Sequence, residues 1–219
     1  MSDMVSGIAA LAVLALLVIA PVALILHRRP PEEVVTTGSV RGQAGMAVHP
    51  WRGHRATTPM SWLLAAGVTA LGLYYVGRSP YAAAVFISAG AYLSYLRWAR
   101  ATDRAGDGTV TLTPEGLHQL HAGSEVFVPW DVVRGLVTTP TDLIVETTRP
   151  VVPVHHMLPW LERRSVVTED AISLPRRNLP PLPYQEMVEL YSTSPGARDE
   201  LATEEPVRRA RGMLSAIPT

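Results

Sequence analysis

The stretch VTLTPEGLHQLHAGSEVFVPWDVVRG, residues 110–135, decides the fold of the C-terminal half of this chain. Apolar and polar residues alternate along it, and the alternation places Val126, Val128 and Trp130 on one face of a strand. A period of two residues is typical of a strand with one buried face. We therefore expect short antiparallel strands here, joined by tight turns.

Two turn signals separate the strands. Residues 113–116, Thr-Pro-Glu-Gly, fit a type I turn because Pro stands at its second position and Gly at its fourth. Residues 122–124, Ala-Gly-Ser, mark a second turn. The sequence thus predicts strands at 108–113, 117–121 and 125–130.

Further short strands and then helices follow. Strands are expected at 136–139, 142–147, 164–168 and 170–174, whereas the proline-rich residues 149–164 show no clear period. Helices are expected at 184–191 and from Ser194 to about residue 202, and the tail 204–219 is expected to be solvated. Strands followed by a C-terminal helix favour the α+β class, with residues 105–203 forming a small antiparallel β-barrel or sandwich closed by a helix.

Two motifs resemble bacterial pleckstrin-homology-like (PH-like) domains. Residues 113–117 read T-P-E-G-L, and residues 128–133 read V-P-W-D-V-V. Residues 190–201 are also similar to the C-terminal helix of membrane-anchored actinobacterial members. The resemblance covers about 105–203 and implies a module that faces a protein or a lipid surface. The turn 113–116 carries no cation, which departs from the PH domains that bind inositol lipids.

Three apolar runs occupy the N-terminal half, at 5–26, 60–77 and 81–98. About 20 apolar residues suffice to cross a ~30 Å hydrocarbon core. We therefore expect a first transmembrane helix within 1–29, a linker at 30–58 and a transmembrane helical hairpin at 59–100. A cleaved signal peptide is the alternative interpretation of the first run.

The hairpin carries its own start signals and a stripe of small residues. Thr58 with Pro59, and Ser79 with Pro80, are each typical of a helix start. Small residues allow two helices to approach closely, although an alanine-rich composition would produce the same pattern. The small residues in question are Ala66, Ala70, Ala84, Ser88 and Ala91.

The arginines around the apolar runs predict an orientation. Five lie between the first two runs, one lies at the hairpin tip, and three follow the third run. Because positive residues stay on the cytoplasmic side, the N-terminus is expected outside and the C-terminal domain in the cytoplasm. The expected location is the inner (plasma) membrane of a cell, with several passes through it.

Composition narrows the class of partner. All nineteen basic residues are Arg, which suggests a GC-rich bacterial genome, and the absence of Cys excludes disulfides and thiolate chemistry. Residues 1–104 hold nine Arg against four acids, and residues 105–219 hold ten against fifteen. The acidic second half argues against nucleic acid as a partner, because phosphate binding needs clustered cations.

No catalytic, cofactor-binding or metal-binding residue is expected. His155 and His156 are adjacent on a predicted strand and face opposite ways, as do His118 and His121, so neither pair is suited to share a metal. HExxH, P-loop, GxGxxG and GxSxG motifs are missing from the sequence. The paired acids at 32–33, 169–170 and 204–205 are interpreted as solvated.

These observations predict a non-enzymatic inner-membrane protein. Its PH-like module would bind a protein, or a lipid surface, in a scaffold or regulatory role, so its expected partners are the lipid bilayer and a protein. The alternative is an accessory subunit of a membrane transport or envelope-synthesis complex, docked through the helical hairpin.

Overall fold

The computed structural model describes residues 30–50, 58–102, 104–158, 167–176 and 179–216. They fall into two compact units. The hairpin unit comprises residues 58–102, and the β unit combines residues 30–50 with the described residues from 104 onward. The expected first helix, at 5–26, lies outside the described residues.

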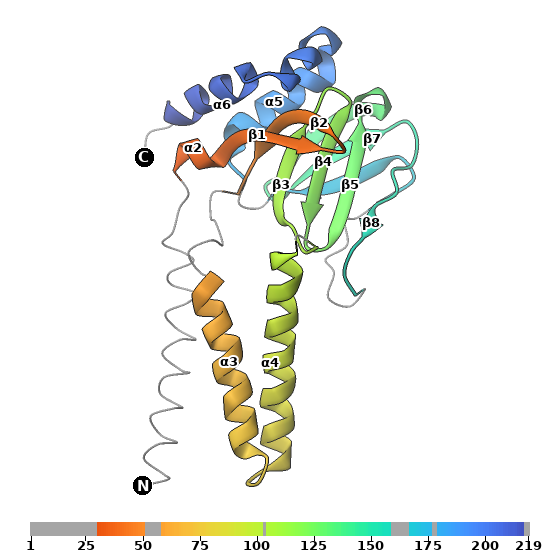
Figure 1. Cartoon of the computed structure of the whole chain (residues 1–219). Coiled ribbons are helices and arrows are strands. Elements are labelled where there is room, and N and C mark those ends of the chain that lie inside the picture. The colour runs from red at the N-terminus through yellow and green to blue at the C-terminus, as the bar shows by residue number, and fades with distance from the viewer. Residues whose placement is uncertain (1–29, 51–57, 103, 159–166, 177–178, 217–219) are drawn as a thin grey trace. The chain divides into compact units, whose positions relative to one another are not determined.

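The hairpin unit consists of α3 (Thr58–Tyr75) and α4 (Pro80–Ala101) (Figure 1). The predicted start of the second helix is confirmed: the Ser79 hydroxyl accepts a hydrogen bond from the backbone N–H of Ala82 at 3.4 Å, and Pro80 takes the first helical position. In the turn between the helices, Arg78 lies 3.9 Å from the centroid of the Tyr74 ring.

The two helices approach most closely at glycines. A Cβ atom on Gly90 would lie 2.2 Å from Thr69 Oγ1, and one on Gly72 would lie 2.8 Å from the backbone nitrogen of Ile87. The small residues predicted for this contact are all exposed instead: Ala66, Ala70, Ala84, Ser88 and Ala91. A shift of one position turns a helical face by about 100°, so a stripe of small residues fixes the contact face poorly.

Within the described residues, we find no helix that combines the length and the apolar character needed to cross a membrane. With 18 residues, α3 spans only about 27 Å at 1.5 Å per residue, and polar residues interrupt it. The 22 residues of α4 are long enough, but Arg97, Arg100 and several Ser and Tyr residues lower its apolar content. The expected transmembrane hairpin at 59–100 is therefore wrong, and so are the multi-pass inner-membrane location and the orientation derived from it.

The larger sheet of the β unit has six antiparallel strands in the order β1-β2-β3-β4-β5-β8. Its strands are β1 (Val35–Val40), β2 (Gln43–Val48), β3 (Asp107–Leu112), β4 (Gly116–His121), β5 (Ser124–Pro129) and β8 (Val154–His155). The three strands predicted from 108 to 130 are confirmed with small shifts at their ends. Ala122 and Gly123, which join β4 to β5, both have positive φ angles, as a two-residue hairpin turn requires.

The smaller sheet has the order β6-β7-β9. Its strands are β6 (Val133–Thr138), β7 (Asp142–Thr147) and β9 (Ala171–Pro175), and the short helix η2 (Trp130–Val132) connects β5 to β6. The expected strand at 164–168 falls mostly outside the described residues, and Val167 forms a single bridge with Ile172.

The sheets do not close into a barrel, so that expectation is wrong. The larger sheet ends at β1 and β8, and the smaller one ends at β6 and β9. The chain passes from one sheet to the other through η2 and not through strand pairing, which leaves all four of these strands at sheet edges. The fold class is α+β with open antiparallel sheets.

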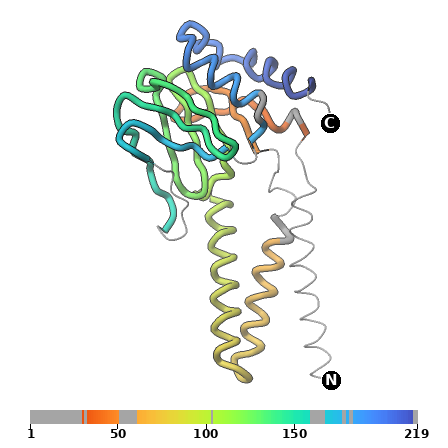
Figure 2. Tube along the Cα trace, turned by 180° about the vertical axis from the view of Figure 1, so that it is seen from behind, coloured from red at the N-terminus to blue at the C-terminus, as the bar shows by residue number. Residues whose placement is uncertain are grey.

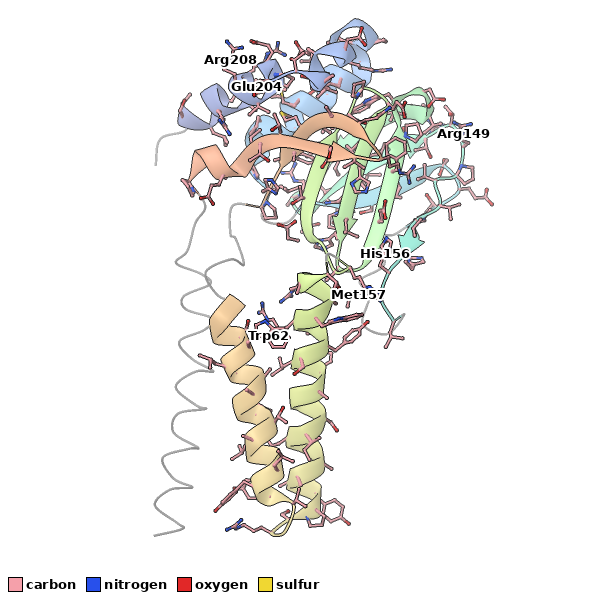
Figure 3. All side chains as sticks on the ribbon, viewed as in Figure 1. Trp62, Arg149, His156, Met157, Glu204 and Arg208 are labelled. Carbon is pink, nitrogen blue, oxygen red and sulfur yellow. The ribbon has the colours of Figure 1, made fainter. Side chains whose placement is uncertain are left out.

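Four helical segments complete the β unit, namely α2 (Pro31–Val34), α5 (Pro181–Thr193), η3 (Pro195–Ala202) and α6 (Glu205–Ser215). Figures 1 and 2 show α5 and α6 side by side in both views. The tail expected to be solvated thus forms a packed helix. Val207, Ala210 and Leu214 are buried on one of its faces, and Glu204 and Arg208 point away from the sheets (Figure 3).

Residues 30–50, which the sequence suggests are a linker, belong to the sheet. Strand β2 pairs with β3 from Met46 to Val48, and β1 pairs with β2 along its whole length. The His49 ring joins them further, since its Nε2 lies 3.0 Å from Thr36 Oγ1 and its Nδ1 lies 2.9 Å from Thr109 Oγ1. The β unit is therefore assembled from both sides of the hairpin in sequence.

Trp130 anchors the core between the two sheets. Its side chain is buried, together with Val126 and Val128, as the alternating pattern predicts. The indole N–H donates a hydrogen bond to the backbone oxygen of Thr113 at 2.8 Å, which satisfies the polar atom of a buried aromatic ring. Thr113, which accepts this bond, is fixed by the predicted turn, because its N–H donates to the oxygen of Gly116 at 2.9 Å.

Candidate functional site

A groove of about 410 Å3 lies between strand β6 and helix α5. It is larger than a second pocket, which lies beside β5. The strand side contributes Val133, Arg134, Gly135, Leu136 and Thr138, β7 contributes Leu143, and the helix contributes Gln185, Glu189, Ser192 and Thr193. A volume in this range suits a short stretch of polypeptide or a small molecule.

The strand side of the groove is a free sheet edge. Strand β6 pairs with β7 alone, and Thr139 donates its N–H to the oxygen of Asp142 at the end of this ladder. Hydrogen-bonded and non-hydrogen-bonded pairs alternate in an antiparallel ladder. Counting back from Thr139, the peptide groups of Thr138 and Leu136 face away from β7 and toward the open edge. Such groups can pair with an added strand.

The helix side of the groove is the polar face of α5. Gln185, Glu189 and Ser192 recur at intervals of four and three, so they share one face of the helix. The opposite face buries Tyr184 and Tyr191 in the core. The apolar residues of α5 repeat with a helical period, so they pack against the core on one face. The groove face therefore carries polar residues that make no core contact.

Two charged side chains line the groove, Glu189 on the helix side and Arg134 on the strand side. The Arg134 guanidinium lies 3.5 Å from a Glu146 oxygen and 3.8 Å from an Asp170 oxygen, and all three side chains are substantially exposed. Ion pairs of this kind contribute little to stability. Asp170 thus joins this network, whereas Glu204 and Glu205 are exposed as expected. The groove lining offers backbone hydrogen bonds, apolar contact, one guanidinium and one carboxylate.

The histidines singled out by the sequence meet at one carboxylate. His118 Nε2 lies 3.1 Å from Glu125 Oε1, and His156 Nε2 lies 2.7 Å from Glu125 Oε2. Partial burial raises the pKa of Glu125, but the hydrogen bonds from His156 and His118 outweigh it and lower the pKa overall.

No group of three His, Asp or Glu side chains within the described residues is arranged to hold a metal ion. In the cluster just described, both imidazoles point at the same carboxylate and are occupied by it. We interpret His118, Glu125 and His156 as a polar clasp that joins the 149–158 segment to β5. The backbone supports this, since His156 donates its N–H to the oxygen of Gly123 at 2.8 Å.

A second polar network fastens the C-terminal helices. The Tyr191 hydroxyl donates a hydrogen bond to Glu200 Oε1 at 2.8 Å, and both oxygens of Glu200 accept from Arg209, at 2.7 and 3.0 Å. The Arg209 hydrogen bonds lower the pKa of Glu200, and burial raises the pKa of Tyr191. The network links α5, η3 and α6, so its role is structural.

Sequence reasoning missed both Glu125 and the groove. Glu125 is one acid among fifteen in the C-terminal half, and only strand pairing brings it beside His118. The groove residues are ordinary polar residues of a strand and a helix. The one available signal was the polar face of α5 at positions 185, 189 and 192.

We find no match among protein-family models, among curated proteins or among solved structures.

Proposed function

We propose that this protein is a non-enzymatic binding module whose β unit receives an extended segment of a partner protein in the groove between β6 and α5. The observation that carries the proposal is the free edge of β6 beside the polar face of α5. An extended chain that adds to a sheet edge gains backbone hydrogen bonds, and flanking pockets select its side chains.

The dimensions of the groove support a peptide ligand. Leu136 and Thr138 offer two successive sets of outward peptide groups, which can register two or three residues of a partner strand. Leu143 gives the groove an apolar base, and Gln185 and Glu189 supply hydrogen-bonding groups opposite the strand. An added strand would therefore contact backbone on one side and helix on the other.

The resemblance to PH-like domains supports the same function. The two motifs that carry it contact each other, since Trp130 of the second donates its indole N–H to Thr113 of the first. The Trp130 backbone N–H also donates to the Glu115 oxygen at 3.0 Å. We propose a PH-like module built on open sheets, in a scaffold or regulatory role.

The test is site-specific photo-crosslinking with the full chain. A fragment beginning at residue 105 is unsuitable, because it would lack β1 and β2, which pair with β3. A crosslinking amino acid placed at Gln185 should capture a defined partner segment. The same group at Glu204, which is exposed on α6, is the control and should not.

The variant Thr138→Pro sharpens this test. Proline removes the N–H that points to the open edge without removing a bond to β7, so the fold should persist while capture from position 185 falls at least about tenfold. Thr138→Ala keeps the N–H and should capture normally. Equal capture from positions 185 and 204, or undiminished capture by Thr138→Pro, would contradict the proposal.

A second candidate is a subunit of a larger complex that docks through the hairpin unit. The observation that favours it is the exposure of large apolar side chains on α3 and α4, including Leu63, Leu73 and Val85 at 63–65%. Contiguous exposed apolar surface marks interaction sites. Crosslinkers at Leu73 and Gln185 separate the two candidates, because each should capture the partner from its own unit only.

A further inference from the structure

A second pocket, of about 240 Å3, lies on the other sheet, between β5 and the segment 149–154. We call it the β5 pocket. Its apolar walls come from three elements. Phe127 and Pro129 belong to β5, Val132 belongs to η2, and the proline- and valine-rich segment supplies Pro150, Val151, Val152 and Val154. Its charged lining residues are Arg41, Glu125 and Arg149.

The pocket exists because the β5–β8 ladder is short. Only Ser124 and Glu125 of β5 pair with β8, so the rest of β5 has a strand neighbour on one side only. Residues 149–153 then run beside this open half of β5 without pairing to it. Figure 3 shows Arg149 at the start of this segment, away from α5 and α6, and His156 beyond its end.

Arg41 reaches the pocket from an unusual backbone position. It occupies the first turn position between β1 and β2 with φ of 54°, followed by Gly42 with φ of 81°. Turns of this type favour Asn, Asp or Gly at that position, because a larger side chain disfavours positive φ. Here the Arg41 guanidinium lies 4.5 Å from the centroid of the Phe127 ring.

The two arginines are available to a ligand. No described carboxylate lies within ion-pair distance of Arg41, whose guanidinium contacts the Phe127 ring. Arg149 makes one contact, at 3.3 Å, with Asp131, and both of these side chains are largely exposed. An exposed pair of this kind is weak, so Arg149 can turn toward a competing anion.

The charge balance selects the kind of anion. Among the lining residues, Arg41 and Arg149 supply two positive charges and Glu125 supplies one negative charge, so the lining carries one surplus positive charge. Asp131, which pairs with Arg149, does not line the pocket. A single carboxylate matches this surplus, whereas a phosphate dianion would exceed it and would meet the field of Glu125 at close range.

From these observations we infer that the β5 pocket binds one aspartate or glutamate side chain of an acidic segment in a partner protein. The carboxylate lies between the Arg41 and Arg149 guanidinium groups, and the side-chain stem packs on Phe127 and the valines. This site lies on the other sheet from the groove of β6 and α5, and the inference does not depend on the function proposed for that groove.

The experiment follows the arginine Nε–Hε signals of the full chain by NMR during peptide titration. The probes are the capped pentapeptide Ser-Val-Glu-Val-Ser, its glutamine analogue, its phosphoserine analogue and sodium acetate. The glutamate peptide should shift the Arg41 and Arg149 signals saturably and bind at least about fivefold more tightly than the glutamine peptide. The phosphoserine peptide and acetate should both bind more weakly than the glutamate peptide.

Four variants complete the test. R41A and R149A should each weaken binding at least about fivefold, and R149A, which lies outside every strand, serves if R41A loosens the β1–β2 turn. D131N frees Arg149 and should tighten binding about twofold, an effect that a purely structural role would not produce. R134A, in the other groove, is the control and should change nothing.

Four results would overturn the inference. Equal binding of the glutamate and glutamine peptides would remove the role of the carboxylate. Tighter binding of the phosphoserine peptide would replace the carboxylate by a phosphate, and equally tight binding of acetate would remove the role of a protein segment. Binding that R149A and D131N both leave unchanged would show that Arg149 takes no part.

Discussion

The hairpin unit buries small side chains, whereas the β unit buries large ones. On α3 and α4 the buried apolar residues are Ala65, Val68, Ala83 and Ala99. The fully buried side chains of the β unit include Met46, Leu112, Tyr184, Met187 and Tyr191. Several aromatic and long aliphatic side chains of the hairpin are exposed, among them Trp62, Leu63 and Tyr81, whereas the β unit uses such side chains to join its two sheets to its helices. Burial of apolar area is the main stabilising contribution, so the β unit holds a core of its own.

The largest expected effect is at Trp130 in the β unit. Trp130→Ala should lower the free energy of unfolding of the β unit by about 3–5 kcal/mol, because it leaves a cavity and removes the indole hydrogen bond to the Thr113 oxygen. The control is Trp62→Ala on α3, which removes an aromatic ring that is 43% exposed.

Urea unfolding followed by far-UV circular dichroism, with hydrogen exchange to assign each unit, measures both variants. We expect Trp62→Ala to change stability by less than about 1 kcal/mol. If Trp130→Ala and Trp62→Ala lower the free energy of unfolding equally, the proposed difference between the cores of the two units is contradicted.

The next effect tests whether residues 204–216 belong to the β unit. Leu214 is buried on α6, and Leu214→Ala should cost about 2–4 kcal/mol, whereas Arg208→Ala, on the exposed face, should cost less than about 0.5 kcal/mol. Thermal unfolding of the full chain measures the difference. A solvated tail would make the two substitutions equivalent.

A smaller effect is expected in the hairpin unit. Gly90→Val places a side chain where a Cβ alone would lie 3.1 Å from the Thr69 Cα, so the helices must separate, at a cost of about 1–3 kcal/mol. Gly77→Ala, with no atom within 4 Å of the added Cβ, is the control. Hydrogen exchange of residues 58–102 should accelerate only in the first variant. Faster exchange in the β unit alone would locate the strain elsewhere.

The smallest effect depends on pH. The pKa of Glu125 is lowered in the folded state, so its stabilising contribution is present above its unfolded pKa of about 4.3 and is lost as pH falls through the folded value. Relative to wild type, Glu125→Gln should lose about 1 kcal/mol near neutral pH, and this gap should shrink below about pH 4. Urea unfolding at several pH values measures it. A gap that stays constant to pH 3 would rule out the histidine–carboxylate clasp.

Sequence reasoning succeeded where partners are near in the chain. The turn at 113–116 and the cap at Ser79 depend on residues within three positions of each other, and both form as predicted. The burial of Trp130 follows from the alternating pattern of the predicted strand 125–130. The helical hairpin was also located correctly, but its contact face and its expected passage through a membrane were not.

The features that sequence reasoning did not predict depend on contacts between segments far apart in the chain. Residues 30–50 carry no clear period and still form β1 and β2, because β3, about sixty residues away, supplies the hydrogen-bonding partner. The arginine-rich stretch 205–215 looks solvated, yet its four buried apolar residues share one face against the rest of the β unit. The groove of β6 and α5 and the β5 pocket likewise combine residues from separate elements.

The sequence by itself therefore determined the short strands, their turns, the two helices of the hairpin and the absence of cysteine chemistry. Each of these follows from local backbone preference or from composition. The tertiary structure alone decided which strands pair, which helix faces are buried, that the sheets stay open, and where Glu125, Arg41 and Arg149 meet their neighbours. Those choices depend on burial and hydrogen bonding between segments far apart in the chain, and no local pattern encodes them.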